Sequence, residues 1–69
     1  MNKIKLHRKE LGLTQAQLAE ASGVNVRLIQ HYEQGQKDIN KAAAITVYSL
    51  AEALNCSVED LLNLEELRK

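Results

Sequence analysis

The sequence predicts an all-α fold, a compact bundle of five short helices. Apolar residues recur three and four positions apart in five segments, as they do along one face of a helix. Proline is absent, and the three glycines, Gly12, Gly23 and Gly35, each separate two such segments, where a residue free to adopt positive φ ends a helix. With no Phe or Trp and only two Tyr, the core must be aliphatic. A chain of 69 residues is expected to form one domain, 1–69.

The first three helices are predicted from signals at their ends. Apolar residues with charges between them predict a first helix at about 2–11. Thr14 and Gln17 have the spacing of a capping box, so a second helix begins there and closes at Gly23. Asn25 is a good N-cap for a third helix, which ends at Gly35.

Two further helices are expected in the second half of the chain. Asn40 could cap a fourth helix, whose apolar residues run at three- and four-residue spacing from Ala43 to Leu54. Asn55 then stops this helix. A fifth opens at Ser57, with Val58, Leu61 and Leu62 facing inward.

Charge is separated along the chain although the net charge is zero. Residues 1–41 hold seven Lys and Arg against four Asp and Glu, a charge of +3. Residues 42–69 hold two against five, a charge of −3. The positive half is suited to phosphates, and the negative half to solvent or a protein partner.

Several classes of protein are excluded by what the sequence lacks. Its single cysteine, Cys56, has no partner for an internal disulfide and no neighbours at metal-ligand spacing. There is no Ser-His-Asp set and no glycine loop that would cradle a phosphate, so we expect no enzyme, cofactor or metal. A signal peptide and an apolar run of about 18 residues are also missing. We therefore expect a cytoplasmic, nucleoid-associated protein that does not enter a membrane.

The most informative stretch is 15–34, which predicts a helix-turn-helix motif. Two helices joined by a tight turn cross closely only if the first carries a small residue, and Ala19 provides it. The turn needs positive φ four residues later, at Gly23. Apolar residues occupy the inward positions of the pair: Leu18, Val24, Ile29 and Tyr32.

These residues resemble the Xre, or lambda-repressor-like (Cro-type), helix-turn-helix family of bacteria and phages. The likeness covers about 4–62. The resemblance implies a five-helix DNA-binding domain whose members often bind inverted repeats as dimers and commonly repress transcription. The shared residues are Arg8, the run Gly12-Leu13-Thr14-Gln15, Leu18-Ala19, Gly23-Val24, Ile29, Glu33, Gly35, Leu50-Ala51 and Leu54.

The resemblance makes the third helix the recognition helix, with four candidate base contacts on its outward face. These are Val26, Arg27, Gln30 and His31. Arginine pairs with guanine and glutamine with adenine, while valine suits the methyl group of thymine.

Further roles follow from the same resemblance. Gln15, Asn25 and Lys37 match positions that contact DNA phosphates, and the N-terminus of a helix favours an anion. Arg8 and Glu33 match a structural ion pair between the first and third helices, which would lock the recognition helix in place.

Two departures from the family pattern leave alternatives open. The connection over 36–43 lacks the usual proline and is longer than is typical, so it forms either an altered loop or a longer fourth helix. Either Lys37 or Lys41 then meets phosphate. Leu28 stands where a small polar residue is usual, so it either touches a thymine methyl or packs against the connection.

Assembly also has two interpretations. Leu64 and Leu67 lie three apart beyond the inward face of the fifth helix, where they are either ordinary surface leucines or a two-fold contact through a C-terminal helix. We expect the contact, and so a homodimer on an inverted-repeat operator. The competing function is an antitoxin-like or accessory module that binds a protein partner through its acidic C-terminal half.

Overall fold

The computed structural model describes the backbone of residues 2–67 and the side chains of residues 2–66. Within this range every regular element is helical, which confirms the all-α prediction. There are six α-helices and one 3-10 helix in the described chain rather than five helices. They are α1 (Lys3–Glu10), α2 (Gln15–Ser22), α3 (Val26–Glu33), η1 (Ile39–Lys41), α4 (Ala44–Ala53), α5 (Val58–Leu61) and α6 (Leu64–Leu67).

The helix ends follow local sequence signals. The Thr14 hydroxyl accepts from the backbone N–H of Gln17 while the Gln17 side chain accepts from the N–H of Thr14, which completes the predicted capping box. Gly23 closes α2 in the left-handed conformation, with φ 74°. Asn55 also has positive φ, 55°, where the chain leaves α4.

One aliphatic core joins the helices. Leu18 of α2, Ile29 of α3 and Leu50 of α4 are fully buried, and Tyr32 adds the one aromatic ring in the core. Burying side chains of this size supplies most of the stability of a small domain. In this core α2 packs on both α3 and α4, so the position of α3 is set by buried contacts.

The connection between α3 and α4, residues 34–43, is an altered loop and not a longer helix. The sequence predicted that Asn40 caps the fourth helix, and this prediction is wrong: the N-cap of α4 is Ala43. The carboxylate of Asp38 accepts from the N–H of Asn40 and starts η1 instead, and α4 begins three residues after η1 ends, at Ala44. Ile39 is buried in the core, which holds the chain in this turn and prevents a continuous helix from 40 onward.

The C-terminal segment is also broken where the sequence suggested continuity. Ser57 and Asp60 form a capping box, but α5 has only one turn. Leu62 is extended (φ −82°, ψ 152°), so α6 starts as a separate turn. The leucines at 64 and 67 therefore do not extend the face of α5.

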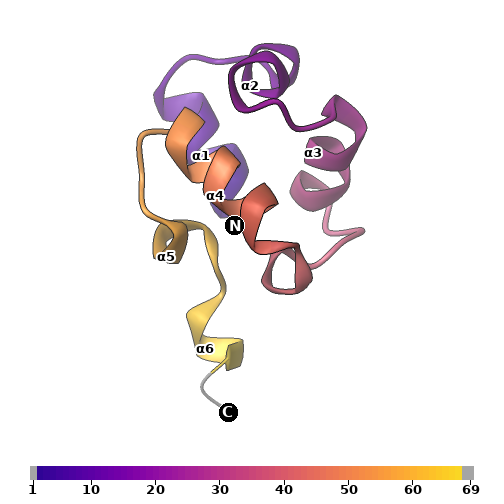
Figure 1. Ribbon diagram of the computed structural model, residues 1–69, viewed down its shortest axis with the longest axis vertical. Coiled ribbons are helices and arrows are strands. Elements are labelled where there is room, and N and C mark those ends of the chain that lie inside the picture. Colours follow the sequence, from indigo (N-terminus) through magenta and orange to yellow (C-terminus); the bar gives the residue numbers. More distant parts are fainter. Residues whose placement is uncertain (1, 68–69) are drawn as a thin grey trace.

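Figure 1 shows how these elements are arranged. α4 crosses in front of α1, α2 lies at the top, and α3 forms the right-hand side. α5 and α6 descend at the lower left, so the described C-terminal end lies far from α2 along the longest axis. Among the helices of residues 2–67, none has the length and apolar character that crossing a membrane requires.

Candidate nucleic-acid interface

The turn between α2 and α3 is fixed by backbone and side-chain hydrogen bonds. Gly23 N–H donates to the carbonyl of Ala19 at 2.9 Å, and the N–H of Val24 donates to Ser22 Oγ at 3.1 Å. Asn25 Oδ1 then accepts from the N–H of Arg27 at 2.8 Å and starts α3. The direction in which α3 leaves α2 is therefore set within three residues.

The inner face of α3 is held by burial. Ile29 is fully buried, Tyr32 nearly so, and Leu28 is partly buried against the same core. Leu28 lies alongside the connection and the start of α4, where it lines grooves together with Thr46. This contact favours the second interpretation of Leu28, as a side chain that packs against the longer connection.

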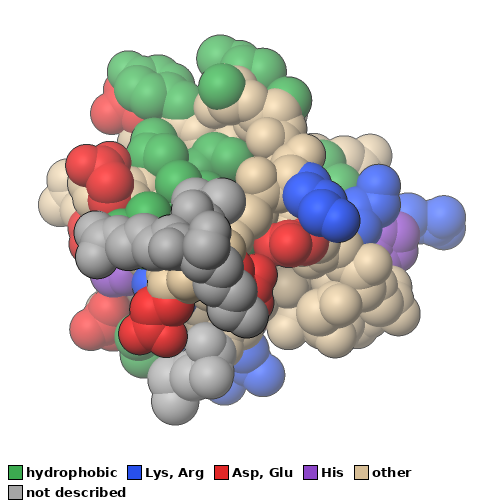
Figure 2. All heavy atoms as spheres, turned by 90° about the horizontal axis from the view of Figure 1, so that it is seen from below, with side chains coloured by type: hydrophobic (Ala, Val, Ile, Leu, Met, Phe, Trp, Pro, Cys, Tyr) green, Lys and Arg blue, Asp and Glu red, His purple; other side chains and the backbone are tan. Residues whose placement is uncertain are grey.

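The four predicted base-contacting residues share the other side of α3. Arg27 is exposed, while Val26, Gln30 and His31 are half-buried. Positions 27, 30 and 31 lie three and four apart, so they are neighbours on one helical face. Figure 2 shows Lys, Arg and His side chains gathered at the edge of the molecule where Figure 1 places α3. The structure thus brings these four residues together beside positive charge.

Arg8 of α1 and Glu33 of α3 form a bidentate ion pair. Arg8 Nε lies 2.8 Å from Glu33 Oε2, and Arg8 Nη2 donates to Oε1 at 3.0 Å. The two side chains are only 10% and 3% exposed. The remaining guanidinium nitrogen, Nη1, donates to the carbonyl of Leu13 at 2.8 Å, so the pair ties both α1 and the loop before α2 to α3.

Gln15, the first residue of α2, belongs to the same network. Its Nε2 donates to Glu33 Oε1 at 3.1 Å. Burial raises the pKa of Glu33, but hydrogen bonds from Arg8 and Gln15, and the charges of Arg8 and Lys5, lower it further than burial raises it. The pKa of Arg8 is raised, chiefly by its hydrogen bond to Glu33. Both groups stay charged, and the second N–H of the Gln15 amide remains available for an acceptor outside the protein.

Lys37 and Lys41 lie at the rim of a groove next to α3. The groove has a volume of about 470 Å³ and is lined by Leu28, Tyr32 and Thr46 as well as the two lysines. Lys37 N–H donates to the carbonyl of His31 at 3.3 Å, which fixes Lys37 to the end of α3. Both lysines are exposed, so the structure brings two cations, rather than one, to this side of α3.

The start of α4 adjoins the same groove. Ala43, at the N-cap position, provides no side-chain hydrogen bond, so the first backbone N–H groups of α4 lack a side-chain partner. Lys41 stands two residues before this N-cap. Exposed cations and free N–H groups in one place suit a phosphate oxygen.

The proposed dimer residues are only partly described. Leu64 is half-buried at the start of α6, and the side chain of Leu67 lies outside the described residues. Large apolar side chains are exposed elsewhere: Ile45 and Tyr48 of α4 are 69% and 54% exposed. Sequence reasoning missed this pair, although their three-residue spacing on α4 was a visible signal.

Sequence reasoning also missed a contact between the connection and the C-terminal segment. Asn40 Nδ2 donates to the carbonyl of Asn63 at 3.0 Å, and the N–H of Asn63 donates to Asn40 Oδ1 at 2.8 Å. The partners are 23 residues apart, and one side of the contact is backbone, so no local pattern announces it.

Comparisons with known proteins agree with this geometry. A family model described as helix-turn-helix matches residues 4–61. An "Uncharacterized HTH-type transcriptional regulator" of Methanothermobacter thermautotrophicus is 41% identical over 64 residues, which cover 91% of this chain and 88% of the relative. That relative is archaeal, so the bacterial or phage source implied by the resemblance stays a prediction. No solved structure matches the chain. By the extent of the family match and the α2–α3 geometry, the chain belongs to the helix-turn-helix family, in its Xre and lambda-repressor-like form.

Proposed function

We propose that this protein is a transcriptional regulator that binds a specific sequence of double-stranded DNA, with α3 in the major groove, and acts as a repressor. The observation that carries the proposal is the division of α3 into two faces. Ile29 and Tyr32 are buried, and on the other side Arg27 is exposed beside Val26, Gln30 and His31. A helix held by its inner face with polar groups outward is suited to reading base edges.

In this proposal, the side chains on the outward face of α3 contact the base edges directly. Arg27 is the candidate for a bidentate contact to guanine and Gln30 for adenine, while Val26 suits the methyl group of thymine. His31 lies one helical turn after Arg27 and extends the same face. Specificity then depends mainly on Arg27, because a bidentate pair to guanine discriminates most strongly.

Phosphate contacts flank the recognition helix on both sides. Gln15 is held by Glu33 with one amide N–H free, and Asn25 caps α3. On the other side Lys37 and Lys41 line the groove that ends at the start of α4. These groups supply the non-specific part of the affinity and hold α3 in register on the duplex.

Repression is favoured over activation because occupying an operator requires DNA binding alone. The polar face described above serves that task, and two copies on an inverted repeat would lengthen the occupied site. We propose that the protein is located in the cytoplasm, associated with the nucleoid, since its proposed ligand is chromosomal DNA.

The test is selection of bound sequences from a random DNA pool, followed by affinity measurements on the selected site. A defined motif should emerge, and the logarithm of affinity should fall linearly with that of salt, with a slope of about −0.9 per phosphate neutralised. Arg27→Ala should relax preference at one base position at a cost of about 1–3 kcal/mol. Lys37→Ala should weaken all sequences alike.

Two results would contradict the proposal at different levels. A wild-type protein that enriches no motif rules out specific DNA binding. An Arg27→Ala variant that selects the unchanged motif leaves DNA binding in place but removes Arg27 from base readout.

A second candidate function, binding of a protein partner through the C-terminal half, is favoured by the exposure of Ile45 and Tyr48 on α4. Apolar side chains this exposed lose water on binding a protein surface. An Ile45→Ser, Tyr48→Ser double variant should then lose a protein that co-purifies with the wild type while it keeps its DNA affinity. Equal co-purification by both proteins would argue against this function.

A further inference from the structure

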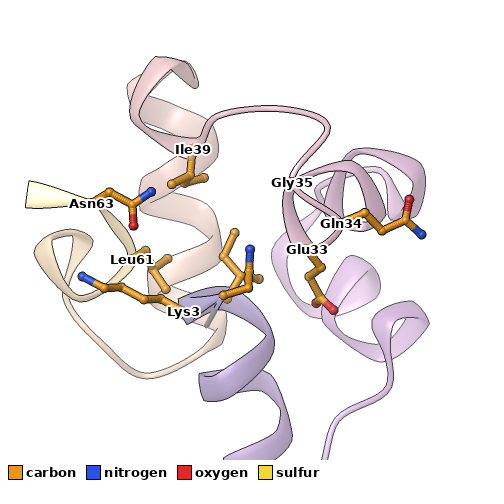
Figure 3. A pocket seen from close by; sticks show the side chains of 9 residues that line it. Lys3, Glu33, Gln34, Gly35, Ile39, Leu61 and Asn63 are labelled. Carbon is orange, nitrogen blue, oxygen red and sulfur yellow. The ribbon is translucent and has the colours of Figure 1, made fainter. Parts of the chain in front are cut away.

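The connection between α3 and α4 is bordered by two pockets. On one side lies a pocket of about 260 Å³, lined by Ile39 and Gly35 of the connection and by Leu61 and Asn63 of the C-terminal segment. Figure 3 shows Ile39, Asn63 and Leu61 on one side of this pocket and Gly35 across from them. The groove that Lys37 and Lys41 line also borders the connection. Only part of the connection therefore packs closely against the rest of the fold.

Hydrogen bonds hold the two ends of the connection in different ways. Its first residues are fixed to α3, because the N–H groups of Gln36 and Lys37 both donate to the carbonyl of His31. Three hydrogen bonds lie within the turn at 38–42. Lys41 N–H donates to the carbonyl of Asp38, Ala42 N–H to the carbonyl of Ile39, and Asn40 N–H to the carboxylate of Asp38. In the described chain, the bonds that tie this turn to another element are the two between Asn40 and Asn63.

These two bonds form what we call the clamp: Asn40 Nδ2 to Asn63 O, and Asn63 N–H to Asn40 Oδ1. One side-chain amide satisfies both backbone groups of one residue, so the clamp fixes orientation as well as distance. Lys3 Nζ donates to the carbonyl of the preceding residue, Leu62, at 2.8 Å. The C-terminal side of the clamp is therefore itself anchored to α1.

We infer that Asn40 is a positioning residue for DNA binding: the clamp holds Lys41 and the uncapped start of α4 where they meet a phosphate. Lys41 directly follows Asn40, and Ala43 at the N-cap of α4 is two residues further. Without the clamp, the turn is joined to the fold by the packing of Ile39 and Ala42 against the core, with no hydrogen bond to another element in the described chain. The exposed Lys41 between them is then less firmly placed, and binding must first order it. Lys37 is independent of the clamp because its own N–H is bound to α3. The inference rests on the proposed function.

The experiment breaks the clamp from each side. Asn40→Ala removes both bonds at the connection. Asn63→Pro removes the backbone donor from the far side and leaves the connection untouched; the extended conformation of Leu62 is the one that a residue before proline adopts. Asn63→Ala is the matched control, because the clamp uses only backbone atoms of Asn63. Circular dichroism should show all three variants folded, since neither asparagine belongs to the buried core.

Affinity for the selected operator should fall about three- to tenfold in Asn40→Ala and Asn63→Pro and stay unchanged in Asn63→Ala. Double variants identify the lysine concerned. In the Lys41→Ala background, Asn40→Ala should lower the affinity for the operator little further. In the Lys37→Ala background, it should lower this affinity by the same factor as in the wild type. If Asn40→Ala acted only by lowering the stability of the whole fold, it would reduce the affinity equally in both lysine backgrounds. Amide exchange at Lys41 and Ala42 should rise in the two clamp variants without DNA.

The outcomes separate this inference from the proposed function. If the wild type binds its operator and both clamp variants bind equally well, the inference is wrong and the function stands. Additive effects of Asn40→Ala in both lysine backgrounds also overturn it. A wild type that binds no DNA overturns the proposed function, and the inference with it.

Discussion

The carboxylate of Glu33 joins three parts of the molecule. Its two oxygens take two hydrogen bonds from Arg8 of α1 and one from Gln15 of α2, while its own helix carries the residues proposed to read bases. A charge this deeply buried is tolerated because each of the two carboxylate oxygens accepts at least one hydrogen bond and the charge is paired with Arg8. The residue that locks α3 to α1 therefore also sets the orientation of Gln15, a proposed phosphate contact.

Removing either member of the ion pair should cost a large part of the stability of the domain. Arg8→Ala or Glu33→Ala leaves the other charge buried without its partner, and we expect each to lower the free energy of unfolding by about 3–5 kcal/mol. Urea denaturation of both variants measures this. Glu10→Ala is the control, since Glu10 pairs with His7 at 3.5 Å but its side chain is 63% exposed. If Arg8→Ala and Glu33→Ala each lowered the free energy of unfolding by less than about 1 kcal/mol, the pair would behave as an exposed ion pair.

The same pair predicts how stability depends on pH. The pKa of Glu33 is lower in the folded protein, because the bonds and charges that favour its carboxylate outweigh burial. A group with a depressed folded pKa adds stability above its unfolded pKa, about 4.3 for glutamate, and loses it as pH falls through the folded value. Thermal melts from pH 7 to 3 should show this loss, and Glu33→Gln should show a smaller one. Parallel pH profiles for the two proteins would exclude Glu33 as the source.

At the scale of elements, the turn of the motif was predictable because its causes are local. Thr14, Gln17, Gly23 and Asn25 act within three or four residues of their partners, and each performs the role that its spacing indicated. The burial of Ile29 likewise followed from helical periodicity.

Gly23 offers a direct test of this element. Its φ of 74° is unfavourable for residues with a Cβ, yet a Cβ built there meets nothing within 4 Å. The cost of Gly23→Ala is therefore backbone strain alone, about 1–2 kcal/mol of unfolding free energy, measured by chemical denaturation. Gly23→Asn should cost less, because asparagine adopts this conformation more readily. Equal stability of Gly23→Ala and the wild type would show that the turn can change its conformation.

The elements that were predicted wrongly depend on distant partners. Asn40 has the side chain of an N-cap, but Asp38 starts the 3-10 turn and Asn40 reaches Asn63 instead. Local spacing cannot decide between a cap and a contact that closes a loop of more than 20 residues.

At the scale of the whole molecule, size limits how the protein meets DNA. The principal extents are 34, 22 and 20 Å, so one copy covers only about one major-groove segment. Two copies related by a two-fold axis would set their α3 helices about 34 Å apart, one turn of DNA. The proposed homodimer on an inverted repeat is therefore consistent with the dimensions of the chain.

The proposed dimer contact can be tested through Leu64, which is half-buried at the start of α6. Leu64→Glu together with Leu67→Glu should convert a dimer to a monomer in sedimentation at micromolar concentration and weaken binding to a full inverted repeat. Binding to a single half-site should be unchanged, which is the internal control. If both proteins sediment as monomers and bind the full repeat equally, these leucines are ordinary surface residues.

The separation of charge along the chain has a consequence for how the protein finds DNA. Residues 1–41 carry +3 and residues 42–69 carry −3. Because the total is zero, we expect a duplex to exert little net pull on a molecule farther away than a Debye length of about 8 Å. The exposed cations Arg27, Lys37 and Lys41, on α3 and in the connection after it, then act mainly once the protein is close to the duplex. We therefore expect such a regulator to search by many brief encounters rather than by long electrostatic capture.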